Sequence, residues 1–179
     1  MGIKYGYSDE IKLVGQVRTN IEDLRQWCGD RINQMTLDKS SYVDGRYQLW
    51  LFHQCNLKTG EITKGYSDDR ITKFSQRIYP GCNIGLLTFH GSKSGISSNG
   101  SIKPHRDHSY AIPISRSVNL GRCVFGYGDE EQNQYKLDDG DIIQFNCKVL
   151  HSVPKILTAE RFSIVFWKLN QSKGYLPIH

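Results

Sequence analysis

The sequence lacks the features that mark membrane-spanning, secreted and zinc-binding proteins. No apolar run within its 179 residues approaches the ~20 residues that a membrane-spanning helix needs. The first residues contain no uninterrupted apolar stretch, so we expect no secretory signal. The five cysteines are odd in number and form no CxxC pair, which argues against a disulfide framework and a structural zinc site. We therefore expect a cytoplasmic protein that does not contact a membrane.

Basic charge is modest and is not gathered into runs. The net charge is +5, and no run of lysine or arginine is longer than two residues. A mildly basic surface favours binding to polyanions, so a nucleic acid is one partner that the composition allows. Nothing in the sequence predicts an obligate protein partner. The length and the mean hydropathy of −0.50 predict a single domain, residues 1–179, around one sizeable core.

The pattern of apolar and polar residues changes near residue 46 from helical to strand-like. Residues 20–35 place apolar side chains on one helical face, with Thr19 or Asn20 as the expected N-cap. Short apolar, β-branched and aromatic segments follow, divided by turn signals such as residues 58–61 and 138–140. The expected strands are 46–57, 61–66, 83–90, 111–115, 117–128, 135–137, 141–147, 149–153 and 161–169. This order predicts a mainly β fold with N-terminal helices, a sandwich or barrel with helical support.

A glycine- and serine-rich segment, residues 91–101, interrupts this series of strands. Such segments are commonly solvated loops. Because this one leads into the densest histidine cluster of the chain, a mobile lid is the second interpretation, and both stay open. Elsewhere, His53 and His179 stand apart from other metal-binding residue types, and we expect both at the surface.

Residue types that bind metals follow this segment. On an extended segment His105 and Asp107 point to the same face, because they are two residues apart. An imidazole and a carboxylate on one face can occupy adjacent positions around a metal. His151 comes later in the chain and supplies a second imidazole. Two histidines and one carboxylate form the facial ligand set of non-haem Fe(II) oxygenases, which leaves three positions open. We therefore expect a metal site at His105, Asp107 and His151.

An arginine and a serine follow His151 by ten and twelve residues. Arg161 opens an apolar strand, and Ser163 shares its face. A guanidinium and a hydroxyl in that arrangement are a fixed pair of donors for a carboxylate. Burying a cation at the start of an apolar strand is costly unless an anion accompanies it. The pattern favours an anion-binding pair, with a structural salt bridge as the alternative.

Together, the HxD pair, the distal histidine within HxV and the RxS pair ten residues on resemble the Fe(II)/2-oxoglutarate-dependent oxygenases. The resemblance covers residues 83–169 and implies a double-stranded β-helix (jelly roll) there, supported by residues 1–82. It implies His105, Asp107 and His151 as the catalytic iron ligands, with Fe(II), 2-oxoglutarate and O2 as cofactors. It also implies that Arg161 and Ser163 hold the distal carboxylate of 2-oxoglutarate.

Within that superfamily the sequence is most similar to the AlkB-like branch. That branch usually has an Asn-x-Tyr pair that touches 2-oxoglutarate, and Thr88 and His90 stand in the corresponding positions, so we expect both near the cosubstrate. The branch has an acidic residue just after HxD, where this chain has His108 and Ser109. It also has a second arginine six residues after the first, where this chain has Trp167. These departures argue against repair of alkylated bases and leave the iron ligands unaffected.

The resemblance implies a dioxygenase that hydroxylates or oxidatively demethylates its substrate, with a nucleic acid as the first candidate. Arg106 and His108 are neighbours of the expected ligands and are predicted to lie on the substrate side. Four aromatic residues could stack on bases, although aromatic residues alternating along a strand more often form core: Tyr42, Tyr47, Trp50 and Phe52. One alternative is a hydroxylase of a small metabolite, peptide or protein side chain. Another is a jelly-roll metal-binding protein without catalytic activity.

Overall fold

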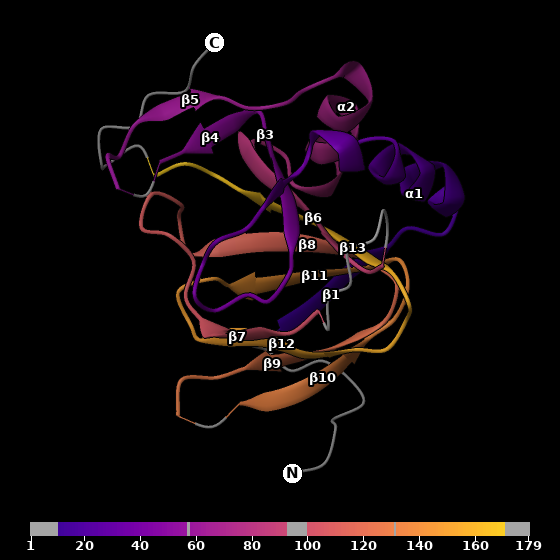
Figure 1. The fold of residues 1–179 in the computed structure, drawn as a ribbon, viewed down its shortest axis with the longest axis vertical. Coiled ribbons are helices and arrows are strands. Elements are labelled where there is room, and N and C mark those ends of the chain that lie inside the picture. The colour runs from indigo at the N-terminus through magenta and orange to yellow at the C-terminus, as the bar shows by residue number, and fades with distance from the viewer. Residues whose placement is uncertain (1–10, 57, 93–99, 131, 171–179) are drawn as a thin grey trace.

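Two antiparallel sheets that face one another form the centre of the fold (Figure 1). The computed structural model describes residues 11–56, 58–92, 100–130 and 132–170. The large sheet contains, in spatial order, β1 (Ile11–Gln16), β11 (Asp141–Asn146), β8 (Ile114–Leu120), β13 (Arg161–Trp167), β6 (Ile84–His90), β3 (Tyr47–Leu51) and β2 (Thr36–Leu37). The small sheet contains β10 (Asn133–Leu137), β9 (Cys123–Tyr127), β12 (His151–Ile156) and β7 (Ile102–His105).

From β6 onward the chain crosses repeatedly between the two sheets. The strands β6, β8, β11 and β13 lie in the large sheet, and β7, β9, β10 and β12 lie in the small one. Every pair of neighbours in these sheets is antiparallel. This winding is the double-stranded β-helix that the sequence predicted. The β1 strand extends the large sheet by pairing with β11, so a segment from the predicted support region adds to the core sheet. The division at residues 82 and 83 stays a prediction.

The two faces of the large sheet pack against different partners. One face meets the small sheet, and the other is covered by helices α1 (Ile21–Gly29) and α2 (Asp69–Ile78), seen above the sheets in Figure 1. Because side chains alternate along a strand, Phe162, Ile164 and Phe166 of β13 pack with Leu24 and Trp27 of α1 in the core on the helix side. The intervening residues of β13 face the space between the sheets, where the predicted functional residues lie.

Most strands predicted after residue 83 are confirmed, with shifted bounds. The predicted strand 117–128 is two strands, β8 and β9, because the chain turns at Gly121, whose φ is 104°. A Cβ there would approach the Glu160 carbonyl oxygen to 2.8 Å, so this turn requires glycine. The predicted strand 111–115 is wrong except at its end, where β8 begins at Ile114. β1 was not predicted. Its adjacent apolar residues Leu13 and Val14 are both exposed, so apolar and polar residues do not alternate along this strand.

The predicted strand 46–57 is also divided. β3 ends at Leu51, and β4 (His53–Cys55) leaves it to pair with β5 (Ile62–Lys64). Phe52 between them has a φ of 66°, a left-handed backbone that turns the chain. The predicted turn at 58–61 is confirmed as the connection of the β4–β5 hairpin, and residue 57 lies outside the described residues.

The expected surface position of His53 is wrong. Its side chain is buried, and Nδ1 lies within hydrogen-bond distance of the Asn83 carbonyl oxygen. An imidazole that meets a backbone carbonyl in this way satisfies its polar nitrogen inside the core. His179 lies outside the described residues.

The helical prediction for residues 20–35 is correct in type and too long. α1 ends at Gly29, and a 3-10 turn, η1 (Ile32–Gln34), follows. Asn20 occupies the N-cap position, but its left-handed backbone (φ 61°) leaves its side chain without a capping hydrogen bond. Gly29 is a poor helix former, which explains the early end. Neither α1 nor α2, the two α-helices of the described residues, has the length and apolarity to cross a membrane.

Helix α2 was not predicted, and Asp68 is the residue that starts it. Its Oδ1 accepts a 2.8 Å hydrogen bond from the Ile71 backbone N–H, as an N-cap does. Its Oδ2 accepts hydrogen bonds from Trp27 Nε1 (2.9 Å), Arg31 Nη2 (2.7 Å) and Tyr66 Oη (2.8 Å). Burial alone would raise the pKa of Asp68, but these hydrogen bonds lower it to about 2. One carboxylate thus joins the start of α2 to α1.

We expect Asp68→Ala to lower the free energy of unfolding by about 2–4 kcal/mol, since a cap is lost and several donors lose their acceptor. Urea denaturation at pH 7 measures this. Because the folded pKa lies below the unfolded value of about 3.9, the carboxylate stabilises the fold above pH 4. That contribution disappears as the pH falls from about 4 to 2, so the two proteins should converge there.

The neighbouring carboxylate, Asp69, is the matched control for this prediction. It lies in the first turn of α2 and is exposed, so Asp69→Ala should change the free energy of unfolding by at most about 0.5–1 kcal/mol. If Asp68→Ala were as mild as Asp69→Ala, the hydrogen bonds to Asp68 would not stabilise the fold as argued.

Candidate metal centre and the cavity around it

His105 and His151 are brought together by the pairing of β7 with β12. His105 is the last residue of β7, His151 is the first of β12, and the two are opposite each other in the antiparallel register. Their ring centroids lie 4.4 Å apart. Residues opposite one another on neighbouring strands place their side chains on the same face. Strand pairing therefore explains how two histidines far apart in the sequence share one site.

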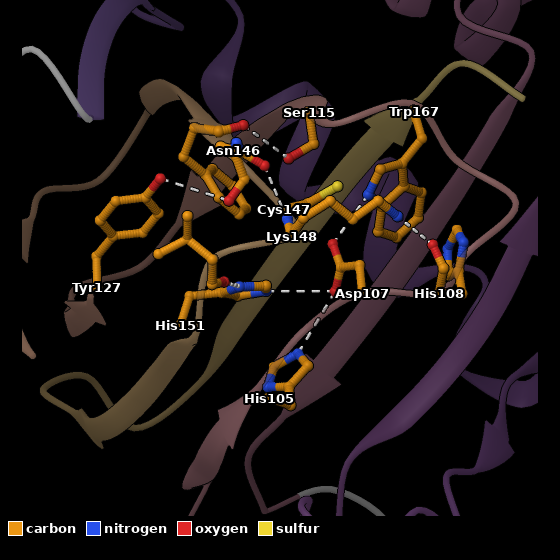
Figure 2. A network of polar contacts seen from close by, with 12 residues as sticks. His105, Asp107, His108, Ser115, Tyr127, Asn146, Cys147, Lys148, His151 and Trp167 are labelled. Atoms are coloured by element: carbon orange, nitrogen blue, oxygen red, sulfur yellow. Dashed lines mark hydrogen bonds and ion pairs between the residues drawn. The ribbon is translucent and has the colours of Figure 1, made fainter. Parts of the chain in front are cut away.

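Asp107 completes this group from just beyond the end of β7 (Figure 2). Its Oδ1 lies 3.5 Å from His105 Nε2 and 3.3 Å from His151 Nε2, and the possible ligand atoms of the three residues lie within 4.8 Å of one another. The prediction that the three residues converge is confirmed. The reasoning from a shared strand face is wrong, because Asp107 lies on irregular backbone. A 2.9 Å hydrogen bond from Asp107 N to Cys147 O holds that segment.

The Asp107 carboxylate and the His151 imidazole stabilise each other's charged forms. Burial alone would raise the pKa of Asp107, but His151 and His105 outweigh it and hold that pKa far below its ordinary value. Burial alone would lower the pKa of His151, but the charge and hydrogen bond of Asp107, with the Val149 carbonyl, raise it. The group thus contains a carboxylate that is held in its ionised form between two imidazoles. A divalent cation needs a deprotonated carboxylate of this kind as a ligand.

Backbone carbonyls orient both histidine rings through contacts with their Nδ1 atoms. His105 Nδ1 lies 3.0 Å from Lys103 O, and His151 Nδ1 lies 2.8 Å from Val149 O. When Nδ1 donates its proton to the carbonyl, Nε2 keeps a free lone pair directed into the group. The His105 ring also stacks on Tyr42, with centroids 4.4 Å apart and planes inclined by 9°. Such outer contacts fix the tautomer and the orientation of metal-binding histidines.

The three residues line a cavity of about 720 Å³ that also contains most of the predicted cosubstrate residues. Arg161, Ser163 and Thr88 lie on its wall. Ser163 of β13 is opposite Thr88 of β6 in the register, and their hydroxyl oxygens are 2.6 Å apart. The structure therefore brings a guanidinium and two hydroxyl groups into one cavity with the two histidines and Asp107.

Arg161 is buried and only partly satisfied. Its Nε donates a 2.7 Å hydrogen bond to Asn119 Oδ1, while its Nη1 is buried without a hydrogen-bond partner among the described residues. None of the ion pairs formed by the described residues involves Arg161, so the alternative of a structural salt bridge has no support there. A buried guanidinium N–H without an acceptor is costly. A carboxylate in the cavity would satisfy it.

His90 lies opposite Arg161 at the end of β6. Only 1% of it is exposed, and both ring nitrogens are buried without a partner in the described part of the chain. Burial, together with the charges of Arg161 and Arg46, lowers the pKa of His90 to about 3, so the imidazole is neutral. His90 is not among the described residues that line the cavity. Its contact with 2-oxoglutarate stays a prediction.

Arg106 and His108, predicted on the substrate side, both line the cavity. Arg106 is about half exposed and pairs with Asp129 at 2.9 Å. The His108 ring stacks on Tyr110, with centroids 3.5 Å apart, and both of its nitrogens are buried without a partner in the described ranges. The placement fits the predicted roles, which stay predictions. The lid hypothesis for 91–101 depends on 93–99, which lie outside the described residues.

Two residues of this site were missed by the sequence reasoning. Asn119 of β8 is fully buried and, besides accepting from Arg161, donates through Nδ2 to Gly121 O (2.6 Å) and Asp138 O (2.9 Å). An asparagine within an apolar strand is costly unless it is hydrogen-bonded, and that cost was the available signal. Trp167 of β13 donates from Nε1 to Asp107 Oδ2, and no sequence spacing indicates this contact.

No family model and no curated protein matches the sequence. Solved structures do match the fold. OsALKBH1, an AlkB homologue, has a TM-score of 0.68 and 15% identity over 91% of this chain and 100% of its own. A Trichoplax adhaerens prolyl hydroxylase, in complex with a peptide fragment of the hypoxia inducible factor oxygen degradation domain, has a TM-score of 0.63 and 12% identity over 93% and 86%. A Burkholderia pseudomallei oxidoreductase of the 2OG-Fe(II) oxygenase family has a TM-score of 0.54 and 15% identity over 93% and 95%.

The chain has the fold of the 2-oxoglutarate- and Fe(II)-dependent oxygenases. The superfamily resemblance read from the HxD, HxV and RxS motifs is confirmed at the level of the fold, and an AlkB homologue is among the matches. At 10–15% identity these matches do not extend to a substrate or a reaction.

Proposed function

We propose that this chain is an Fe(II)- and 2-oxoglutarate-dependent dioxygenase. The observation that carries the proposal is a single cavity in which a group of two histidines and one aspartate lies beside a buried arginine with an unpartnered N–H. A metal-binding protein without catalytic activity needs the first feature but gains nothing from the second. An enzyme that binds a dicarboxylate next to its metal needs both.

His105, Asp107 and His151 would hold the iron as a facial set of ligands. When Fe(II) and 2-oxoglutarate are bound, the chemistry supplied is activation of O2 coupled to conversion of 2-oxoglutarate into succinate and CO2. The protein's part is to present the ligand atoms in a fixed arrangement. The carbonyl contacts at Nδ1 of each histidine keep Nε2 available, so little reorganisation is needed when the metal binds.

Arg161, with Ser163 and Thr88, would bind the distal carboxylate of 2-oxoglutarate. The contact from Arg161 Nε to Asn119 orients the guanidinium before any ligand arrives, and this reduces the entropy lost on binding. Anchoring the distal end of the cosubstrate sets the position of its 2-oxo acid end relative to the metal ligands. Because Arg161, Ser163 and Thr88 are buried, a carboxylate bound to them would be shielded from bulk water.

The proposed reaction is hydroxylation or oxidative demethylation, with a nucleic acid as the first candidate substrate. The exposed lysines Lys39 and Lys58 line the cavity together with Arg106, so an anionic polymer entering there would meet positive charge. Trp50, which is only half-buried, offers a surface on which a base could stack. The likeness to OsALKBH1 supports this candidate.

A peptide, protein side chain or small metabolite is the second candidate substrate. Arg106 is already paired with Asp129, which leaves Lys39 and Lys58 as the exposed, unpaired cations among the described lining residues. A cavity of about 720 Å³ lies within the usual size range of small-molecule sites. The likeness to a prolyl hydroxylase crystallised with a peptide supports this candidate.

Thermal unfolding with Mn(II) as an oxygen-stable substitute for Fe(II) tests the proposal. Mn(II) should raise the melting temperature, and 2-oxoglutarate should raise it further, by about 5–10 °C at a hundredfold excess over its Kd. Succinate release with Fe(II) and O2 then tests turnover. Stabilisation by Mn(II) that 2-oxoglutarate does not increase, with no succinate formed, would favour the metal-binding protein without catalytic activity.

The salt dependence of oligonucleotide binding separates the two substrate candidates. If Lys39, Lys58 and Arg106 each neutralise one phosphate, affinity for a single strand should fall about 20-fold between about 50 and 200 mM salt. Fluorescence anisotropy of a labelled oligonucleotide measures this. A Lys39→Gln, Lys58→Gln double variant should bind more weakly and show a shallower salt slope. Binding that is absent or insensitive to salt would point to the second candidate.

A further inference from the structure

A hydrogen bond from another side chain holds the carboxylate of Asp107, as backbone carbonyls hold the rings of the two histidines. The structure assigns Trp167 as a positioning residue for Asp107, an inference that rests on the proposed function. Trp167 Nε1 donates a 3.0 Å hydrogen bond to Asp107 Oδ2. Figure 2 shows Trp167 reaching Asp107 from the side opposite His105 and His151.

The two carboxylate oxygens of Asp107 have different tasks. Oδ1 faces both imidazoles, at 3.5 Å from His105 Nε2 and 3.3 Å from His151 Nε2, whereas Oδ2 is occupied by the indole N–H of Trp167. A carboxylate held in this way offers one oxygen, and not two, to a cation. Binding through one oxygen keeps the other positions around the metal free for the cosubstrate and O2.

Asp107 needs such a contact because its backbone does not fix its side chain. β7 ends at His105, and Asp107 lies in the irregular segment that follows, so no neighbouring strand residue packs directly opposite it. The hydrogen bond from Asp107 N to Cys147 O holds the backbone but leaves the carboxylate free to rotate. The contact with Trp167 restricts that rotation before a metal binds.

Trp167 is rigid enough to act as a fixed donor. It is the last residue of β13, opposite Ile84 of β6, and only 3% of it is exposed. Its ring packs edge-on against His108, with centroids 4.9 Å apart, and against Trp50 at 6.3 Å. The indole N–H therefore has one accessible direction, toward Asp107.

A purely structural interpretation of the same contact is that Asp107 satisfies a buried indole N–H. The two interpretations differ in what loss of the donor changes. If Trp167 only packs, losing the N–H lowers stability and leaves metal binding unchanged. If Trp167 positions Asp107, losing the N–H weakens metal binding and changes the coordination of the bound ion, even when the fold is intact.

Titration of the full chain with Co(II), followed by visible absorption, reports both affinity and coordination. Trp167→Phe removes the donor and some volume. Site-specific replacement of Trp167 by benzothienylalanine, in which sulfur replaces the N–H, removes the donor and keeps the ring. Trp27→Phe is the matched control, because it likewise removes an indole N–H that donates to a carboxylate, that of Asp68, but away from the cavity. Melting temperatures show that each variant is folded.

We expect both Trp167 replacements to weaken Co(II) binding about tenfold or more and to change its spectrum. Trp27→Phe should leave both unchanged. Binding and a spectrum like those of the original protein after the benzothienylalanine replacement would overturn the assignment, since the donor would then be dispensable. If the original protein failed to bind Co(II), the proposed function itself would fail, which is a different result from an intact site that ignores Trp167.

Discussion

Asp107→Ala is expected to abolish Fe(II)-dependent release of succinate from 2-oxoglutarate, lowering turnover by at least about a hundredfold. The reason is the geometry of Oδ1, which lies 3.5 Å from His105 Nε2 and 3.3 Å from His151 Nε2 and belongs to the one carboxylate of that group. Loss of a residue that hydrogen-bonds to a metal ligand typically costs about 10–100-fold in metal affinity or activity. Loss of the ligand itself should therefore cost more. Coupled detection of succinate at saturating 2-oxoglutarate measures the effect.

Asp129→Ala is the matched control for this prediction. Asp129 is a carboxylate near the same cavity that pairs with Arg106 at 2.9 Å and accepts a 2.8 Å hydrogen bond from Leu150 N. It is half exposed and outside the metal-binding group. Its removal should leave uncoupled succinate release within about twofold, since exposed pairs contribute little. Equal turnover by the Asp107 and Asp129 variants would refute the ligand assignment.

The candidate metal-binding group was predictable from residue types and chain order. His105, Asp107 and His151 belong to a short list of metal-binding residue types, and Arg161 stands out against the apolar strand that it opens. Their spatial convergence follows from the register of β7 with β12 and of β13 with β6. That register is a tertiary property, and the sequence supplied it only through the family resemblance.

The hydrogen bonds that hold Arg161 and Asp107 in place were not predictable. Asn119 and Trp167 touch Arg161 and Asp107 only because β8 and β13 neighbour each other and because β7 ends where it does. A buried tryptophan is common in any core, so neither type nor spacing distinguishes Trp167. An asparagine in an apolar strand signals that Asn119 needs hydrogen-bond partners, but not which residues they are. A single sequence identifies the side chains that do chemistry better than those that hold them in place.

The fold shows the same division between local and tertiary information. The turn at 58–61 marks strand ends locally and was anticipated, whereas the turn at Gly121 was missed, because the apolar residues on both sides of it predicted one continuous strand. The break at Phe52 could not be anticipated, because a left-handed backbone at a bulky residue is imposed by the pairing of β4 with β5. Helix α2 was missed because many of its residues are polar and its start depends on Asp68.

Arg161→Ala is expected to raise the KM for 2-oxoglutarate about a hundredfold. Truncating one partner of a buried, hydrogen-bonded charge pair costs about 2–5 kcal/mol, and about 2.8 kcal/mol corresponds to a hundredfold change. Arg161→Lys keeps the charge but loses the planar fork of donors and should give an intermediate KM. Arg116→Ala is the control for general damage, because Arg116 also makes partly buried hydrogen bonds, to Gln144 and the Ile78 carbonyl, away from the cavity.

The decisive measurement is discrimination between 2-oxoglutarate and a 2-oxo acid that lacks the distal carboxylate. In the original protein the Arg161 Nη1 donor is buried without a partner in the described residues, so a ligand without that carboxylate should bind poorly. Arg161→Ala removes the unsatisfied donor and, with it, the preference for 2-oxoglutarate over the acid that lacks the distal carboxylate. The two acids should then bind the variant with similar affinity, which Mn(II)-dependent thermal shifts measure. Preference for 2-oxoglutarate that persists in Arg161→Ala would mean that another residue receives the distal carboxylate. His90, buried opposite Arg161 with both ring nitrogens free in the described chain, would be the first to replace in that case.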